Sequence, residues 1–231
     1  MAWLRPLTSS GVWRLLCRLR LHYKRGRRYV HSPDPDYERK LARVQAARGL
    51  ARWNPTRYVV LYEDELTYYL RPPVAQGYAP AGADAPRAPQ GWGKNRSWRI
   101  AGSLNPLTGQ HHAQQAAHFD RHTFLAYLRT LEAAYPAAQR IFVVLDNWPV
   151  HFHVDVQAGL VGSRIRLLPL PTYAPWTNPE EKVWLTAYRE VFHLHEFATH
   201  WPDFKQVVQT WLDHVDDDPH ALLRLVGLCP T

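Results

Sequence analysis

Cysteine and long apolar runs are both scarce in this chain of 231 residues. Its two cysteines, Cys17 and Cys229, lie near opposite ends of the sequence. This excludes a disulfide-stapled scaffold and a cysteine-based zinc module, and it fits a reducing compartment. No stretch approaches the roughly 18 apolar residues of a membrane-spanning helix, so we expect no membrane partner. With 46% hydrophobic residues and ten tryptophans, the chain can bury the core of one large domain, with or without an appendage.

Acidic residues are absent from residues 1–32, which carry eight of the 28 lysines and arginines. The net charge of the whole chain is +8, so the positive charge belongs to this one segment. Such a segment usually binds a polyanion, most often nucleic acid. We therefore predict that residues 1–32 form a basic DNA-binding helical arm. Its expected DNA contacts are Arg14, Arg18, Arg20, Lys24, Arg25, Arg27 and Arg28.

A helix is predicted directly after Thr8, because Thr8, Ser9 and Ser10 provide capping side chains and apolar residues then recur at helical spacing. Arg14 and Arg18 share another face of this helix, which suits docking in a DNA groove. Two other interpretations stay open. An arginine-rich, acid-free start is also typical of a mitochondrial transit peptide, and a basic helix can simply present a solvated face.

The rest of the chain divides at turn-rich segments. Residues 33–56 are predicted to form a linker helix, residues 57–195 the main α/β domain, and residues 196–231 a C-terminal helical extension. Strands first and strand–helix units later indicate a mixed sheet with helices on both faces. Apolar runs occur at 58–62, 66–70, 97–104, 110–116, 141–145 and 164–168, and helices are expected after Asp120 and over 150–160, 179–191 and 202–215.

Three carboxylates come at the ends of these elements. Asp64 and Asp146 each follow an apolar run, and Glu181 lies in the first turn of a helix. If the two strands are parallel neighbours, both aspartates emerge at one edge of the sheet. Carboxylates that converge repel each other unless cations share the site, and oxygen ligands suit Mg²⁺ or Mn²⁺. Two such ions can promote phosphodiester cleavage, so we expect a two-ion site.

Each of these residues also has an ordinary structural interpretation. Asp64 belongs to an acidic triplet that could form a turn, and Asp146 begins a normal strand-to-loop pair. Glu181 could complete a capping box with Asn178. His151 could be a packing histidine. The adjacent Glu63, Glu65 and Glu180 are interpreted as lying outside the catalytic set.

The same residues carry a resemblance to a known family. Leu61–Glu65 resembles a first strand with an Asp-Glu pair, and Gly77–Gly82 a Trp-x-x-x-Gly element with Tyr78 in place of tryptophan. Leu145–His151 resembles an Asp-Asn-x-x-x-His element. Leu168–Trp184 resembles a Leu-Pro-x-Tyr-Ser-Pro-x-Leu-Asn-Pro-Ile-Glu-x-x-Trp run. The chain thus resembles the DDE transposases of the mariner-like superfamily, specifically the bacterial insertion sequence 630 family, in which an interval like the 34 residues between Asp146 and Glu181 is typical.

The resemblance implies an RNase H-like fold with a mixed five-stranded sheet. It implies that Asp64, Asp146 and Glu181 hold Mg²⁺ or Mn²⁺ and cleave DNA at transposon ends, before the freed 3′-hydroxyl is joined to target DNA. Asn147, His151 and Asn178 are the expected supporting residues of that site.

The expected partner is double-stranded DNA, namely terminal inverted repeats and target DNA. A homodimer and an upstream helix-turn-helix polypeptide are further candidates, because the chain resembles an N-terminally truncated member that keeps only the end of the helix-turn-helix region. The expected location is the bacterial cytoplasm, associated with the nucleoid. The competing hypothesis is a catalytically idle DNA-binding remnant or regulator of a transposable element.

Overall fold

The computed structural model describes residues 8–21, 31–82 and 84–228, and the chain forms two compact units, residues 1–31 and 32–231. The first unit contains α1 (Ser9–Arg18), where the Thr8 hydroxyl accepts a hydrogen bond from the backbone N–H of Gly11 at 3.2 Å. The helix predicted after Thr8 is therefore confirmed. Arg14, Arg18 and Arg20 are exposed, whereas Lys24, Arg25, Arg27 and Arg28 lie outside the described residues.

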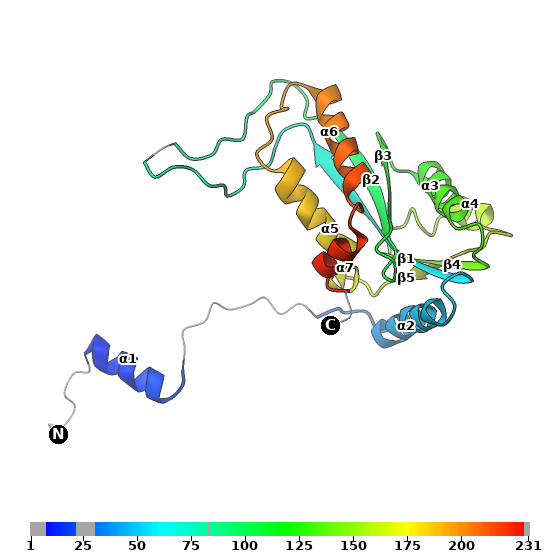
Figure 1. Cartoon of the computed structure of the whole chain (residues 1–231), viewed down its shortest axis with the longest axis horizontal. Coiled ribbons are helices and arrows are strands. Elements are labelled where there is room, and N and C mark those ends of the chain that lie inside the picture. Colours follow the sequence, from blue (N-terminus) through cyan, green and yellow to red (C-terminus); the bar gives the residue numbers. More distant parts are fainter. Residues whose placement is uncertain (1–7, 22–30, 83, 229–231) are drawn as a thin grey trace. The chain divides into compact units, whose positions relative to one another are not determined.

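A mixed five-stranded sheet forms the centre of the second unit (Figure 1). The strands are β1 (Tyr58–Tyr69), β2 (Ser97–Leu104), β3 (His111–Ala116), β4 (Arg140–Leu145) and β5 (Ile165–Pro169), in the order β3-β2-β1-β4-β5. β1, β4 and β5 run parallel, while β2 and β3 pair antiparallel. This confirms the mixed sheet expected from the sequence.

The two apolar runs at 58–62 and 66–70 belong to one strand, which corrects the expectation that the acidic triplet ends the first run. Glu63, Asp64 and Glu65 lie inside β1 and pair with Ser103, Gly102 and Ala101 of β2. Carboxylates have low strand propensity, but pairing with a neighbouring strand overrides it. Asp64 is consequently held by a rigid ladder rather than by a turn.

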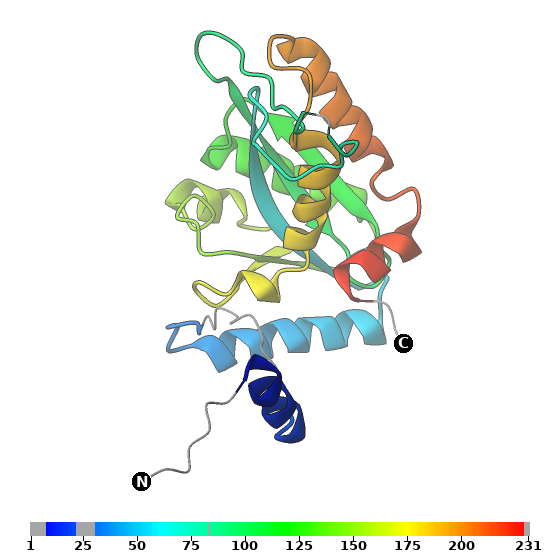
Figure 2. The same cartoon turned by 90° about the vertical axis from the view of Figure 1, so that its left-hand side faces the viewer.

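Helices cover both faces of the sheet, as predicted (Figure 2). α3 (Arg121–Ala134) and α4 (Val154–Gly159) pack on the face that carries Val59 and Leu61. On the other face, α2 (Tyr37–Trp53) packs on Val60 and Tyr62. The helix expected as a linker is therefore part of the domain core.

The same face of the sheet that α2 covers is covered further along β1 by the C-terminal helices. α5 (Glu180–Ala187) runs into a π-helical turn (Tyr188–Phe192), and this pair packs with α6 (Trp201–His214) on Leu66 and Tyr68. A short 3₁₀ helix (Pro175–Thr177) precedes α5. In the described residues, no helix is both long and apolar enough to cross a membrane.

Two helices differ from the predicted ranges. α4 begins at Val154 instead of residue 150, because the His153 side chain caps it by accepting a hydrogen bond from the N–H of Asp155 at 3.2 Å. α7 (Pro219–Val226) lies within the predicted helical extension of residues 196–231, but no separate helix was expected at these residues. Its signals were nevertheless local: Asp218 caps its start, and Gly227 ends it with a φ of +78°, a left-handed conformation that favours glycine.

Candidate active site

Asp64 and Asp146 lie at equivalent heights on neighbouring parallel strands. The last paired residues of β1 and β4 are Tyr62 and Val144, and each aspartate follows two residues later. Asp146 leaves the sheet in the loop after β4, whereas Asp64 stays within β1, where β2 still pairs with it. The expected convergence at the end of the parallel strands is thus realised, although only one of the two strands ends there.

Asn178 fixes the start of α5 and with it the position of Glu181. Its side-chain amide donates to the carbonyl of Glu63 at 2.9 Å, and its Oδ1 accepts from the N–H of Glu180 at 3.1 Å. The backbone N–H of Asn178 donates to the carbonyl of Pro175 at 2.9 Å, so this group is not the partner of Glu181. The capping-box interpretation of Glu181 therefore loses its reciprocal hydrogen bond.

A cleft of about 350 Å³ brings the predicted site residues together. Asp64, Asp146 and Glu181 all line it. Its other walls are Asn147, Trp148, Asn178 and the segment from Leu170 to Pro175. Glu181 and Asp146 are exposed there, whereas Asp64 is half-buried.

The electrostatics of the cleft are uneven. Burial, helped by the negative charge of Glu181, raises the pKa of Asp64 to about 8. Burial and Asp146 also raise the pKa of Glu181. Burial works in the same direction at Asp146, but hydrogen bonds from His151 and from the backbone N–H of Trp148 outweigh it and hold the pKa of Asp146 below its usual value. The site thus pairs a firmly ionised carboxylate with one that keeps its proton at neutral pH.

His151 connects the cleft to the opposite face of β1. Its Nε2 lies 2.8 Å from Glu65 Oε1 and its Nδ1 lies 3.3 Å from Asp146 Oδ1. Burial alone would lower the pKa of His151, but the hydrogen bonds to Asp146 and Glu65 raise it to about 10. The imidazolium therefore bridges two carboxylates, and its ring packs against Phe124 of α3 with centroids 4.5 Å apart.

Glu63, Glu65 and His151 also have donor atoms within 4.8 Å of one another. Glu63 is fully buried, and neither of its oxygens has a hydrogen-bond partner in the described part of the chain. Burial and the charge of Glu65 raise the pKa of Glu63 well above its usual value, which favours the protonated acid. Both ring nitrogens of His151 already contact a carboxylate, Nε2 that of Glu65 and Nδ1 that of Asp146. The cluster of Glu63, Glu65 and His151 is therefore better suited to orienting Asp146 than to ligating a metal.

Glu180 points away from the cleft although it precedes Glu181 directly. Its side chain is fully buried, and Oε1 lies 2.7 Å from Nε2 of His111 on β3. Gly102 makes room for this contact, because a Cβ there would meet the Glu180 carboxylate and lie 2.6 Å from the Trp184 ring. Glu180 therefore anchors the first turn of α5 to the sheet.

The donor set of the cleft fits a hard divalent cation. Three carboxylates face one space, and burial together with the negative charge of Glu181 raises the pKa of Asp64, a cost that a bound cation would reduce. Such ions prefer oxygen ligands. Asp64, Asp146 and Glu181 are the residues that could hold them.

Tyr173 marks the rim of the cleft. It has a φ of +54° and its side chain is 74% exposed. A bulky residue with positive φ is strained, and such strain is concentrated at functional sites. Trp176, three residues further along the chain, is also exposed.

Sequence reasoning did not find every residue that shapes the site. Glu65 and Glu180 were interpreted as lying outside the catalytic set, yet each makes a buried contact: Glu65 with His151, and Glu180 with His111. Lys40, which contacts Asn147 at 3.3 Å, was not singled out. No local signal indicates these contacts, because their partners lie between 69 and 107 residues away in the sequence.

Comparisons with known proteins identify the family of this chain and its fold. A family model described as DDE superfamily endonuclease matches residues 59–201. The insertion element IS630 uncharacterized 39 kDa protein of Shigella sonnei is 24% identical over 202 residues, which are 87% of this chain and 57% of that protein. The chain thus spans little more than half the length of this relative.

Solved structures show the same fold. The Mos1 mariner paired-end complex with Mn superposes with a TM-score of 0.61 at 16% identity, over 95% of this chain and 67% of that one. The catalytic domain of Mos1 mariner transposase gives a TM-score of 0.53 at 14% identity, over 88% and 91%. The RNase H-like fold that the sequence resemblance implied is confirmed.

Proposed function

This chain belongs to the DDE superfamily of endonucleases, and we propose that it cleaves DNA at transposon ends and joins the freed 3′-hydroxyl to target DNA. The observation that carries the proposal is the cleft in which Asp64, Asp146 and Glu181 meet. The proposed substrate is double-stranded DNA: terminal inverted repeats first, and target DNA afterwards. Such an enzyme would act at the nucleoid, in the cytoplasm of a bacterium.

The proposed cofactor is a pair of Mg²⁺ or Mn²⁺ ions held by Asp64, Asp146 and Glu181. When bound there, two ions would supply Lewis-acid chemistry to the attacking and leaving oxygens of an in-line displacement. Mos1 mariner paired-end complexes have been solved with Mn and with Mg, which supports this choice for a chain of the same fold.

Other residues of the chain orient the proposed metal ligands and set their protonation. His151 orients Asp146 through its hydrogen bond and keeps that carboxylate ionised. Asn178 sets the direction of α5 and so aims Glu181 at the cleft. Asp64 must release its proton before its full charge is available, because its pKa is raised to about 8. The exposed rings of Tyr173 and Trp176 suit stacking on bases that are unpaired near the cut.

DNA binding is proposed for the basic arm, residues 1–32, through Arg14, Arg18 and Arg20 together with Lys24, Arg25, Arg27 and Arg28. The arginines of α1 are exposed and available for phosphate contacts. A homodimer is a proposed partner, since related Mos1 structures are paired-end complexes. A helix-turn-helix polypeptide that binds the same ends is a second proposed partner.

Cleavage and metal binding test the catalytic proposal together. Wild type and the double substitution Asp64→Asn/Asp146→Asn are compared by Mn²⁺ calorimetry and by nicking of a duplex that bears the element's terminal repeat. We expect the double substitution to remove both metal binding and nicking. Unchanged metal binding would refute the site. DNA binding by a wild-type chain that never nicks would favour the idle remnant or regulator instead.

The arm is tested separately by Arg14→Ala/Arg18→Ala. Because each phosphate contact releases counterions, the slope of DNA affinity against salt concentration should flatten by about one to two units on a logarithmic plot. Calorimetric Mn²⁺ affinity should not change. A mobility-shift series with an unaltered salt slope would assign α1 to packing or targeting.

A further inference from the structure

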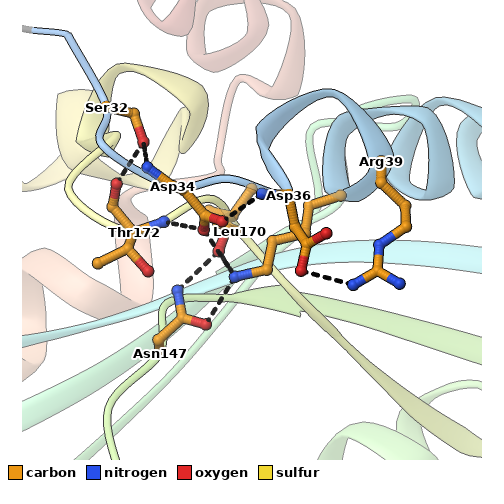
Figure 3. A network of polar contacts seen from close by, with 8 residues as sticks. Ser32, Asp34, Asp36, Arg39, Asn147, Leu170 and Thr172 are labelled. Atoms are coloured by element: carbon orange, nitrogen blue, oxygen red, sulfur yellow. Dashed lines mark hydrogen bonds and ion pairs between the residues drawn. The ribbon is translucent and has the colours of Figure 1, made fainter.

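A cluster of polar contacts joins the start of the second unit to the edge of the cleft (Figure 3). Ser32, the first residue of that unit, donates its hydroxyl to the carbonyl of Thr172 at 2.6 Å. Asp34 accepts from the N–H of Thr172 at 2.8 Å through Oδ2. These contacts bridge about 140 residues of sequence, and Thr172 lines the cleft.

Lys40 of α2 extends this cluster to the loop after β4, which carries Asp146 and Asn147. Its Nζ donates to Asp34 Oδ2 at 2.8 Å, to Asn147 Oδ1 at 3.3 Å and to the carbonyl of Leu170 at 3.4 Å. The side chains of Lys40 and Asp34 are only 16% and 5% exposed. This is therefore a shielded, multiply bonded ion pair, unlike a surface pair that solvent screens.

Asn147 is the residue through which this cluster reaches the proposed metal ligands. It follows Asp146 directly, and its Nδ2 donates to the carbonyl of Leu170 at 2.7 Å while its Oδ1 faces Lys40. The backbone beyond β4 has no ladder to hold it. Both polar atoms of the Asn147 side chain are hydrogen-bonded, Nδ2 to Leu170 and Oδ1 to Lys40, and these bonds restrain the backbone next to Asp146.

The ionisation of Asp34 supports a permanent contact. The hydrogen bond from Lys40, together with the backbone N–H groups of Thr172 and Asp36, holds the pKa of Asp34 well below its usual range. Asp34 is consequently charged throughout the neutral range, and the cluster stays assembled under conditions in which DNA would be cleaved.

We propose that Ser32, Asp34 and Lys40 form a clasp that positions Asn147 and the Leu170–Thr172 edge of the cleft, with Lys40 acting as a positioning residue for DNA cleavage. The role in cleavage rests on the proposed function, whereas the restraint on the cleft edge does not. Geometry explains the expected effect: misplacing a reacting group by about 1 Å can cost on the order of a hundredfold in rate.

Lys40→Met tests the clasp, since it keeps the length and apolar stem of lysine and removes its charge and donors. Single-turnover nicking at saturating Mn²⁺ should slow at least about tenfold, while the dissociation constant for DNA stays at its wild-type value. Hydrogen exchange should accelerate around Asn147 and at the N–H of Thr172. Asp34→Asn, which keeps the shape of the turn, should cause a smaller change in the same direction.

Arg39→Met is the matched control on the same helix. It removes a neighbouring ion pair, Arg39 to Asp36 at 2.6 Å, whose side chains are 62% and 44% exposed. In Figure 3 the dashed line from Arg39 leads to Asp36 and not to Asn147, Leu170 or Thr172. Nicking and exchange should both remain at wild-type values.

A coupling measurement separates positioning from general destabilisation. If Lys40 acts through Asn147, the substitutions Lys40→Met and Asn147→Ala should not add in their effects on nicking, whereas independent damage would add. Wild-type exchange in Lys40→Met, or additive effects of the two substitutions, would overturn the clasp. A wild-type chain that does not nick would count against the proposed function alone, and the exchange data would then decide the clasp by themselves.

Discussion

Glu180 and Glu181 are neighbours in the sequence and have opposite environments. Glu181 is exposed in the cleft beside Asp64 and Asp146, while Glu180 is fully buried against His111 and Gly102. β1 repeats the contrast: Asp64 faces the cleft, and Glu65 reaches His151 on the other face of the sheet. Glu181 and Asp64 are thus each accompanied by a neighbouring carboxylate that turns inward.

The comparison shows that the cleft depends both on the carboxylates that line it and on the carboxylates that turn inward. The carboxylates that line it supply negative charge for a cation, and the inward carboxylates hold the elements that carry them. Glu180 anchors α5, which presents Glu181, and Glu65 holds His151, which orients Asp146. Substitutions in the first set should therefore affect chemistry, and substitutions in the second should affect stability and protonation.

The largest effect is expected for Glu181→Gln. Nicking should fall by about a hundredfold or more, because charge stabilisation by a bound metal is worth several kcal/mol and each 1.4 kcal/mol is a factor of about ten. DNA binding should be retained. The melting temperature of the metal-free protein should stay equal or rise, since a repulsive carboxylate is gone. Near-normal nicking would end the catalytic assignment of Glu181.

The next effect concerns protons at Asp64. A metal ligand must be deprotonated, so Mn²⁺ affinity should fall about tenfold for each pH unit below the Asp64 pKa of about 8. Calorimetry in buffers of different ionisation enthalpy should count about one proton released near pH 7. A pH-independent affinity would mean that Asp64 is not a ligand.

The same pKa makes a prediction for stability. Because folding raises the pKa of Asp64 from 3.8 to about 8, the native state binds more protons than the unfolded state between these values. The metal-free protein should therefore lose stability from this group as the pH rises from about 4 to about 8. Asp64→Asn should abolish that part of the slope in thermal melts.

A smaller effect, on stability, is expected for the inward residue of the α5 pair. Glu180→Gln keeps an acceptor for His111 but places an amide donor at the position of Oε2, which has no hydrogen-bond partner in the described chain. An unsatisfied buried donor costs about 1–3 kcal/mol, so urea denaturation should show a loss of this size. Glu181→Gln is the exposed control. Equal stability of the Glu180→Gln and Glu181→Gln variants would contradict the anchoring role of Glu180.

The smallest effect is expected for Glu65→Gln. Hydrogen bonds to Asp146 and Glu65 raise the pKa of His151 from 6.5 to about 10. The charged form of His151 therefore stabilises the fold fully below about pH 6.5, and this stabilisation is lost as the pH rises towards 10. Without the Glu65 charge the pKa should fall and the alkaline loss should begin at lower pH. NMR titration of the His151 ring checks this. An unchanged pKa would show that Asp146 alone sets it.

Local chemistry in the sequence was enough for much of this protein. Thr8 and Asp120 predicted helix starts because their side chains can cap a helix. In the structure the Thr8 hydroxyl and the Asp120 carboxylate accept hydrogen bonds from backbone N–H groups of the first turn. The residues from Asn105 to Gly109, between the runs at 97–104 and 110–116, are of the types that favour a turn, and Gly109 has a φ of +75°. These features depend only on neighbouring residues. The spacing of Asp146 and Glu181 likewise carried the family resemblance.

Tertiary structure alone decided which carboxylates share the cleft. The acidic triplet in β1 could be read as a turn until β2 paired with it, since strand propensity yields to cross-strand contacts. Whether Glu180 or Glu181 faces the cleft depends on where Asn178 and His111 hold α5. The clasp of Asp34 and Lys40 joins segments that are more than 100 residues apart. Such contacts form only when the chain closes on itself, so local sequence pattern cannot reveal them.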